Sequence, residues 1–240
     1  MGNDLLDLRS LPGLVAGVTG HRRIAFEDPA STAISDTLQY LLQRLNDELT
    51  AVSANPVLFS PNASALRIIG MAAQGADLLA MRAAHRLKFP IACALPFLVD
   101  EYRKDFKDSS FRNLFEEVLR ESESIIELPG TREEGARSYE RANEVILSNS
   151  SMIIAVWDGM RARGVAGTGD MVQMAFERGM PTIVIDPKSP RDPSLLMRPK
   201  DDPARFLQAV DAVREKIPDS FSDLFRRLLN PRAQTGSGAP

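Results

Sequence analysis

The chain has little of the chemistry that builds disulfides or metal sites. Cys93 is its one cysteine, which excludes an intrachain disulfide. His21 and His85 are its two histidines, and together with a single cysteine they fall short of a usual zinc ligand set. We therefore expect no metal site and no certain cofactor, although Mg²⁺ could accompany the phosphates of a bound ligand.

Positive charge and long apolar runs are also scarce. The formal net charge is −3, whereas a general nucleic-acid binder needs a surplus of Lys and Arg against phosphates. No apolar run approaches the roughly 18 residues that span a bilayer, and the N-terminus lacks the basic start and apolar stretch of a signal peptide. We therefore expect a cytoplasmic protein with no nucleic-acid partner and no membrane contact of its own.

Short apolar runs alternate with helical patterns along most of the chain. The expected strands cover residues 14–18, 66–70, 91–95, 124–128, 152–157 and 181–185. Helical periodicity fills the intervals, over residues 34–49, 76–87, 110–121, 136–148 and 169–178. Such alternation predicts right-handed crossovers and a mostly parallel sheet, and continuous apolar runs fit strands that are buried on both faces. The prediction is an α/β, Rossmann-like, doubly wound sheet in three layers.

The sequence also predicts a division of the chain. Residues 12–187 form the sheet domain, and residues 188–203 are a Pro-rich linker. Helical periodicity returns over residues 204–230, as a short appendage that packs on the sheet or mediates self-association. Residues 231–240 have the composition of a flexible tail.

The loop after the first strand has the composition of a phosphate cradle. It reads GVTGHR. Gly17 and Gly20 allow backbone amides to approach a ligand, Thr19 offers a hydroxyl, and His21 and Arg22 offer donors and positive charge. The spacing is neither that of a G-x-G-x-x-G fingerprint nor that of a Walker loop. The alternative is a tight turn with a solvated arginine.

The loop after the second strand clears space at the start of a helix. It reads GMAAQGAD, and a helix N-terminus favours an anion. We expect Gln74, Gly75 and Asp77 to contact the ligand. The alternative role of Asp77 is a capping carboxylate that fixes the loop.

The segment after the strand at residues 152–157 carries a third set of candidates. Asp158 stands at the carboxyl end of that strand, where it could bind a ribose hydroxyl or act as an acid or base. Gly167, Thr168 and Gly169 open the next helix as a further anion site.

Four motifs occur in a specific order. They are GVTGHR at residues 17–22, AQGAD at 73–77, LPF at 95–97, and AVWDG at 155–159 with the later Gly167-Thr168. The ordered set resembles the SLOG superfamily, which is related to the Lonely guy phosphoribohydrolases, the DprA-like domains and the nucleoside deoxyribosyltransferases. The resemblance implies a dimeric Rossmannoid protein that binds a nucleotide or a nucleotide-derived signal such as an ADP-ribose- or NAD-related molecule, and that serves as the sensor part of a bacterial defence or signalling system.

One departure from the family motif bears on catalysis. The phosphoribohydrolases carry a glutamate at the position where this chain has Met171, and a thioether cannot act as a general base. Asp170 and Asp158 remain the candidate catalytic residues if the protein is an enzyme. The sequence therefore favours a ligand sensor over a nucleosidase or phosphoribohydrolase that cleaves an N-glycosidic bond. A Rossmannoid domain that has lost its ligand is the third possibility.

Two further pairs are candidates from other segments. Glu101 and Tyr102 could border the pocket from the loop after the third strand, although their run also resembles a solvated helix start. Tyr139 and Asn143 lie one helical turn apart and could reach the pocket of a neighbouring subunit, or form a surface helix face.

Overall fold

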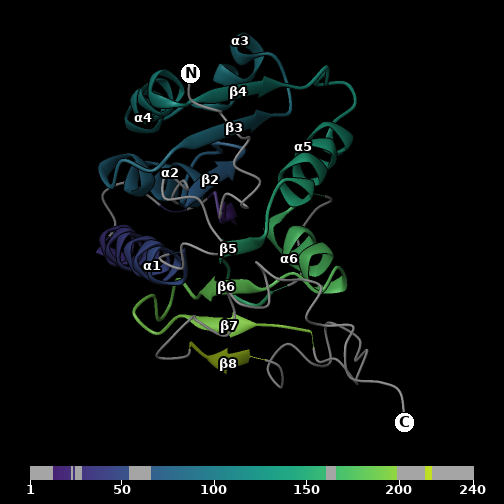
Figure 1. Cartoon of the computed structure of the whole chain (residues 1–240). Coiled ribbons are helices and arrows are strands. Elements are labelled where there is room, and N and C mark those ends of the chain that lie inside the picture. The colour runs from purple at the N-terminus through teal and green to yellow at the C-terminus, as the bar shows by residue number, and fades with distance from the viewer. Residues whose placement is uncertain are drawn as a thin grey trace, which may run out of the picture.

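The computed structural model describes residues 13–22, 24, 29–53, 66–160, 166–198 and 214–217. Helices and strands alternate through these ranges (Figure 1). The strands are β1 (Val15–Gly20), β2 (Arg67–Gly70), β3 (Ile91–Leu95), β4 (Ser124–Glu127), β5 (Met152–Val156), β6 (Thr182–Ile185), β7 (Ser194–Leu196) and β8 (Arg214–Lys216). The helices are α1 (Pro29–Ser53), α2 (Ala76–Arg86), α3 (Val99–Tyr102), α4 (Ser109–Glu121), α5 (Ala136–Ser148) and α6 (Thr168–Glu177), with a 3₁₀ turn at Arg103–Asp105.

The described strands form one sheet of mostly parallel strands. Their order is β4-β3-β2-β1-β5-β6-β7-β8. The pairs from β4 to β6 are parallel, and β7 and β8 join the edge in antiparallel orientation. The chain winds outward from β1 to β4 and then returns to place β5 on the other side of β1. This reversal is the topological switch point at which open α/β sheets bind their ligands.

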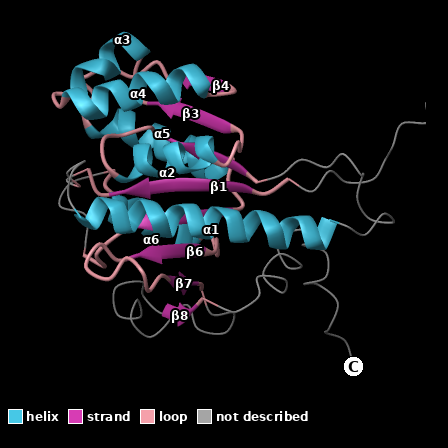
Figure 2. Cartoon of the chain, turned by 90° about the vertical axis from the view of Figure 1, so that its left-hand side faces the viewer, coloured by secondary structure: helices cyan, strands magenta, loops and turns pink. Residues whose placement is uncertain are grey.

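Helices cover both faces of the sheet, as predicted. Figure 1 shows α1, α2 and α4 on one face and α5 and α6 on the other. In Figure 2 the first face is toward the viewer, and α1 crosses in front of the sheet. Within that layer, α2 packs against both α1 and α4. The predicted three-layer, Rossmann-like α/β fold is confirmed.

The periodicity of the sequence explains this packing. The apolar face predicted for the first helix is buried in α1, namely Ile34, Leu38, Leu41, Leu42, Leu45 and Leu49. Every residue of β3 and of β5 is buried, because helical layers cover the central strands from both sides. The edge strand β4 lacks this cover, and its four residues are exposed despite two isoleucines.

The fold of the C-terminal part of the described residues differs from the sequence prediction. Residues 194–196, assigned to a linker, form β7, in which Leu195 and Leu196 are buried. Residues 214–216, assigned to a helical appendage, form β8. Three-residue strands are too short to show a period, which is why the pattern missed them. Residues 199–213 and 218–240 lie outside the described ranges, as do the helical segments and the tail predicted there.

None of the helices in the described ranges combines the length and the apolar character that crossing a membrane requires.

Candidate functional site

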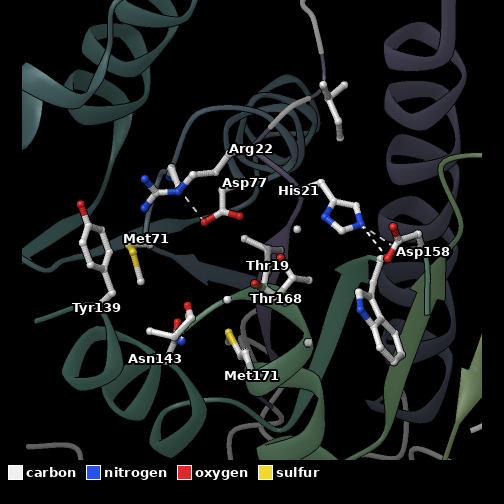
Figure 3. Close-up of a pocket in the computed structure, with 18 of the residues that line it drawn as sticks. Thr19, His21, Arg22, Met71, Asp77, Tyr139, Asn143, Asp158, Thr168 and Met171 are labelled. Atoms are coloured by element: carbon white, nitrogen blue, oxygen red, sulfur yellow. Dashed lines mark hydrogen bonds and ion pairs between the residues drawn. The ribbon is translucent and has the colours of Figure 1, made fainter. Parts of the chain in front are cut away.

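A cavity of about 820 Å³ opens at the carboxyl ends of β1 and β5. Pairing of Thr19 with Ala155 and of Gly20 with Val156 brings the ends of these two strands together. Figure 3 shows the side chains that converge there from both halves of the sheet. The volume lies within the range of ordinary small-molecule sites, and the position is the switch point of the sheet.

The lining comes from seven segments of the chain. It comprises residues 18–22 and Ile24 at the end of β1 and just after it, Met71 and Ala73 after β2, Asp77 on α2, Gly135, Ala136, Tyr139, Asn143 and Ile146 at α5, Trp157, Asp158 and Met160 after β5, residues 166–169 and Met171 at α6, and Pro187 and Lys188 after β6.

The N-terminus of α6 forms one wall and carries no side-chain cap. Gly167 is the N-cap residue and has no side chain that could accept from the first helical amides. Asp170 does not fill this role, because its Oδ2 accepts from the Gly167 amide at 3.3 Å. Thr168 and Gly169 line the cavity directly. The first-turn amides and the positive end of the helix dipole are therefore available to an anion.

The approach to α6 is held in an unusual backbone conformation. Ala166 has φ 68°, in the left-handed region that costs a non-glycine residue about 1–3 kcal/mol. Asn143 on α5 is buried, and its Nδ2 donates to the Ala166 carbonyl at 3.3 Å. This contact helps to fix the loop that presents the start of α6.

His21 and Asp158 form a second wall. The Asp158 amide donates to His21 Nε2 at 3.2 Å, and His21 Nε2 lies 3.2 Å from Asp158 Oδ1. The same Oδ1 accepts from the Met160 amide at 3.0 Å, and Trp157 Nε1 donates to the Met160 carbonyl at 2.7 Å. Burial acts to raise the pKa of Asp158, but the Met160 amide and His21 outweigh it and lower the pKa below its ordinary value. Asp158 is therefore ionised near neutral pH, which suits a hydrogen-bond acceptor and not a general acid.

Arg22 lies in an aromatic and charged cluster at the opposite end. Its guanidinium carbon lies 4.8 Å from the centre of the Tyr139 ring, and its Nη1 lies 3.7 Å from Asp105 Oδ2. Tyr139 donates its hydroxyl to the same oxygen at 2.7 Å, while Arg132 binds the other oxygen of Asp105 at 2.9 Å. Burial alone would lower the pKa of Arg22, but Tyr102, Tyr139 and Asp105 together raise it. The guanidinium stays charged.

Asp77 is a buried carboxylate on the cavity wall. Its residue is 5% exposed, and its Oδ2 accepts from the Ala73 amide at a long 3.4 Å. Burial raises the pKa of Asp77 to about 7, although Arg22 and the amides of Ala73, Met71 and Gly20 act in the opposite direction. Both protonation states of this group are populated at neutral pH.

The structure brings together nine of the residues predicted to bind a ligand. These are Thr19, Gly20, His21, Arg22, Asp77, Asp158, Gly167, Thr168 and Gly169. Five predicted ligand residues do not line the cavity, namely Gly17, Gln74, Gly75, Glu101 and Tyr102, and neither does the candidate catalytic residue Asp170.

Two of the predicted glycines, Gly17 and Gly75, serve backbone packing and do not line the cavity. A Cβ on Gly17 would lie 2.5 Å from Ser150 Oγ, under the end of α5. A Cβ on Gly75 would lie 2.3 Å from the His21 carbonyl, and Gly75 also has φ 94°. The Ala76 amide donates to that carbonyl at 3.2 Å. The start of α2 is thus closed by the backbone after β1, and contact of Gln74 or Gly75 with an anion stays a prediction.

Glu101 and Tyr102 are not among the residues that line the cavity. Glu101 pairs with Lys104 and with Arg132. Tyr102 is buried and packs edge-on against Phe106, with ring centres 5.6 Å apart. α3 turns Tyr102 into an aromatic core, and contact of either residue with a ligand stays a prediction.

The sequence analysis did not predict that Tyr139 and Asn143 line the cavity. Both line the cavity of their own chain, whereas the sequence favoured a surface face or a neighbouring pocket. Their spacing of one turn on α5 was a usable signal, but only the return of the chain to β5 places that helix face on the cavity. Lys188 at the rim and the thioethers of Met71 and Met160 were also missed.

Met171 lies in the cavity wall, beside the start of α6. The position that the family motif gives to a catalytic glutamate therefore faces the site but holds a thioether. Asp170, the alternative, is occupied as the partner of the Gly167 amide. Among the lining residues the carboxylates are Asp77 and Asp158.

Neither a protein-family model nor a curated protein matches the chain. Several solved structures are similar to it. DNA processing protein A from Streptococcus pneumoniae aligns with a TM-score of 0.49 and 14% identity over 89% of this chain and 61% of that one. The same protein from Helicobacter pylori aligns with a TM-score of 0.48 and 13% identity, over 92% and 82% of the two chains.

A third similar structure is that of a protein named TM1055, with a TM-score of 0.41 and 10% identity over 70% of this chain and 72% of that one. At such identities the likeness concerns the fold and no ligand. The chain spans 61% of the length of the Streptococcus pneumoniae protein.

The comparison corrects one expectation. The Helicobacter pylori structure is described by its single-stranded DNA binding mode, so a protein with a similar arrangement of strands and helices has a nucleic-acid partner. The prediction that nucleic acid is excluded as a partner of this chain is therefore wrong. It rested on net charge, which averages over the whole surface and does not describe a local site.

Proposed function

We propose that the cavity binds a nucleotide-derived small molecule, of the ADP-ribose- or NAD-related class, and that the chain is a ligand-binding module rather than a hydrolase. In this proposal it is the sensing part of a bacterial defence or signalling system, as the sequence resemblance implies. The observation that carries the proposal is the uncapped N-terminus of α6 at Gly167 and Thr168, inside an 820 Å³ cavity at the switch point of the sheet.

The two ends of the cavity suit the parts of such a ligand. Thr168 and Gly169 offer amides to a phosphate, and Lys188 adds positive charge at the rim. Asp158 is ionised and suits a ribose hydroxyl, while its neighbour Trp157 supplies apolar wall. These features together support a ligand with phosphate, sugar and base.

The chemistry of the wall favours binding without turnover. Cleavage of an N-glycosidic bond uses a carboxylate at the reacting carbon and an acid for the leaving group. Met171 supplies neither, and the lowered pKa of Asp158 leaves it unprotonated near neutral pH. Asp77, whose pKa of about 7 suits an acid, lies at the opposite end of the cavity from Asp158, so the two do not flank one bond. We therefore expect a bound nucleotide to be released intact.

A thermal-shift screen tests the proposal. The panel contains AMP, ADP-ribose, NAD, cyclic ADP-ribose isomers and cyclic dinucleotides, each with and without Mg²⁺. A ligand at about 100 times its Kd stabilises the folded state by about 2.7 kcal/mol, which raises Tm by several degrees. Each mixture is then analysed by chromatography. Recovery of the stabilising ligand intact supports the proposal, whereas a released base with ribose phosphate overturns it in favour of a hydrolase.

A further inference from the structure

The end of the cavity formed by α2 and α5 combines a carboxylate, a guanidinium and flat apolar groups. Figure 3 shows Asp77, Arg22, Tyr139 and Met71 together there, opposite His21 and Asp158. Phosphate has no favourable place beside Asp77, because two anions would share one buried site. The end therefore suits the part of a nucleotide that is flat and uncharged.

Asp77 has acceptor capacity to spare. A carboxylate offers about four lone-pair positions. The amides of Ala73, Met71 and Gly20 act on it, and the Ala73 amide does so at a long 3.4 Å. The carboxylate is almost fully buried, so water replaces the missing partners poorly. A donor from a ligand would add a partner to a carboxylate whose desolvation Arg22 and these amides offset only in part, since its pKa stays at about 7.

Arg22 likewise keeps donors for a ligand. A guanidinium has five N–H donors in a planar fork. Its carboxylate neighbour Asp105 lies at 3.7 Å and is already bound by Tyr139 and Arg132. Stacking on the Tyr139 ring holds the fork in place. A fixed donor fork beside a fixed acceptor defines a pattern that a ligand edge must complement.

We infer that Asp77 and Arg22 together read the edge of an adenine base, with Asp77 accepting from the amino group and Arg22 donating to the adjacent ring nitrogen. Adenine presents this donor beside an acceptor on one edge, and Tyr139 and Met71 give its faces apolar neighbours. The inference deepens the proposed function and rests on it. It also moves Arg22 from the phosphate, where the sequence placed it, to the base.

The inference fixes the sign of a pH effect. A donor from the ligand stabilises ionised Asp77, so the pKa of this carboxyl falls on binding, and affinity is lost as pH drops below the value of about 7 in the free protein. Between pH 6 and pH 8 affinity should rise by about tenfold. A phosphate at this end would give the opposite slope.

The other titratable groups around Asp77 do not change protonation state between pH 6 and pH 8. Arg22 faces it from the end of β1, Tyr102 from α3 and Cys93 from β3. Burial raises the pKa of Cys93 to about 11 and that of Tyr102 well above its ordinary value. All three keep one protonation state between pH 6 and pH 8.

Calorimetric titration with ADP-ribose and its hypoxanthine counterpart tests the inference, because their diphosphates do not titrate in this pH range. Hypoxanthine replaces the amino donor by a carbonyl acceptor. We expect the wild-type protein to bind ADP-ribose at least tenfold more tightly. Asp77→Asn should weaken ADP-ribose binding at least tenfold, reduce the difference between the two ligands to less than about threefold, and flatten the pH dependence. Asp100→Asn, a change at a carboxylate whose side chain is 90% exposed, is the matched control and should change none of these.

The outcomes separate the inference from the proposed function. Equal affinity of wild-type protein for the two ligands, or affinity that falls from pH 6 to pH 8, overturns the reading of the base and leaves nucleotide binding intact. The same holds if ADP-ribose fails to bind while another nucleotide of the screen binds. If no nucleotide binds, both fail together. Should Asp77→Asn not fold, the ligand pair and the pH dependence of the wild-type protein decide alone.

Discussion

Asparagine at position 77 should make the protein more stable, and more so at pH 8 than at pH 5. The pKa of Asp77 is about 7 in the folded protein, against an ordinary value of 3.8. The folded state thus holds this proton more tightly than the unfolded state does. The stability contributed by protonated Asp77 is complete below pH 3.8 and is lost as the pH rises toward 7.

The size of the stabilisation by Asp77→Asn follows from the rise in the pKa of Asp77 on folding. At about 1.4 kcal/mol per pKa unit, the raised pKa of Asp77 lowers the free energy of unfolding by about 2 kcal/mol at pH 5, where folding takes up a proton, and by about 4 kcal/mol at pH 8, where the buried group is ionised. Asparagine keeps an oxygen for the Ala73 amide but carries no charge. The gain in free energy of unfolding on Asp77→Asn should therefore be larger at pH 8 than at pH 5 by roughly 2–3 kcal/mol.

Urea denaturation at the two pH values measures this difference. Asp100→Asn is again the control, because its carboxylate is exposed and pairs only across one helical turn with Arg103. A gain that is equal at pH 5 and pH 8 would refute the reasoning, since it would show that Asp77 is ionised throughout. Stabilisation combined with weaker ADP-ribose binding would identify a buried charge kept for ligand recognition at the expense of stability.

Three further substitutions have defined outcomes. Arg22→Ala should weaken ADP-ribose binding at least tenfold in calorimetry, because it removes a charge-assisted hydrogen bond; unchanged affinity would remove Arg22 from the site. Gly167→Val should abolish binding while circular dichroism stays native, because the extended backbone at φ −78° and ψ 175° accepts any residue; a global loss of structure would instead make Gly167 a folding residue. Gly75→Ala should lower the free energy of unfolding by more than about 2 kcal/mol, since its Cβ would meet the His21 carbonyl at 2.3 Å. Gly135→Ala, also at positive φ but with nothing within 4 Å of the new Cβ, should cost only about 1 kcal/mol, and equal losses at the two positions would contradict the packing argument.

The alternation of apolar runs was sufficient to predict the fold from β1 to β6. The strand over residues 152–157 stood out because a parallel strand buried on both faces is apolar without interruption. The apolar pattern did not predict β7 and β8, because a strand of three residues is too short to show a hydrophobic period. Pro193, directly before β7, is also a residue typical of loops. Antiparallel pairing at a sheet edge depends on distant partners that a local pattern does not contain.

The sequence predicted the site residues that follow the ends of strands, and it missed those that lie on helices. His21 and Asp158 follow β1 and β5, so the rule for parallel sheets located them. Tyr139 and Asn143 reach the cavity only because α5 lies on the face opposite α2. Gly75 shows the converse ambiguity, because a glycine required by close backbone packing looks in sequence like one required by a ligand.

The central claim is that the cavity at the switch point binds a nucleotide and leaves it intact. Calorimetric titration of the protein with ADP-ribose, followed by chromatography of the mixture from the calorimeter, tests it most directly. The account predicts saturable binding at one site per chain and full recovery of ADP-ribose. Absence of binding at millimolar ligand, or recovery of free adenine, would contradict it.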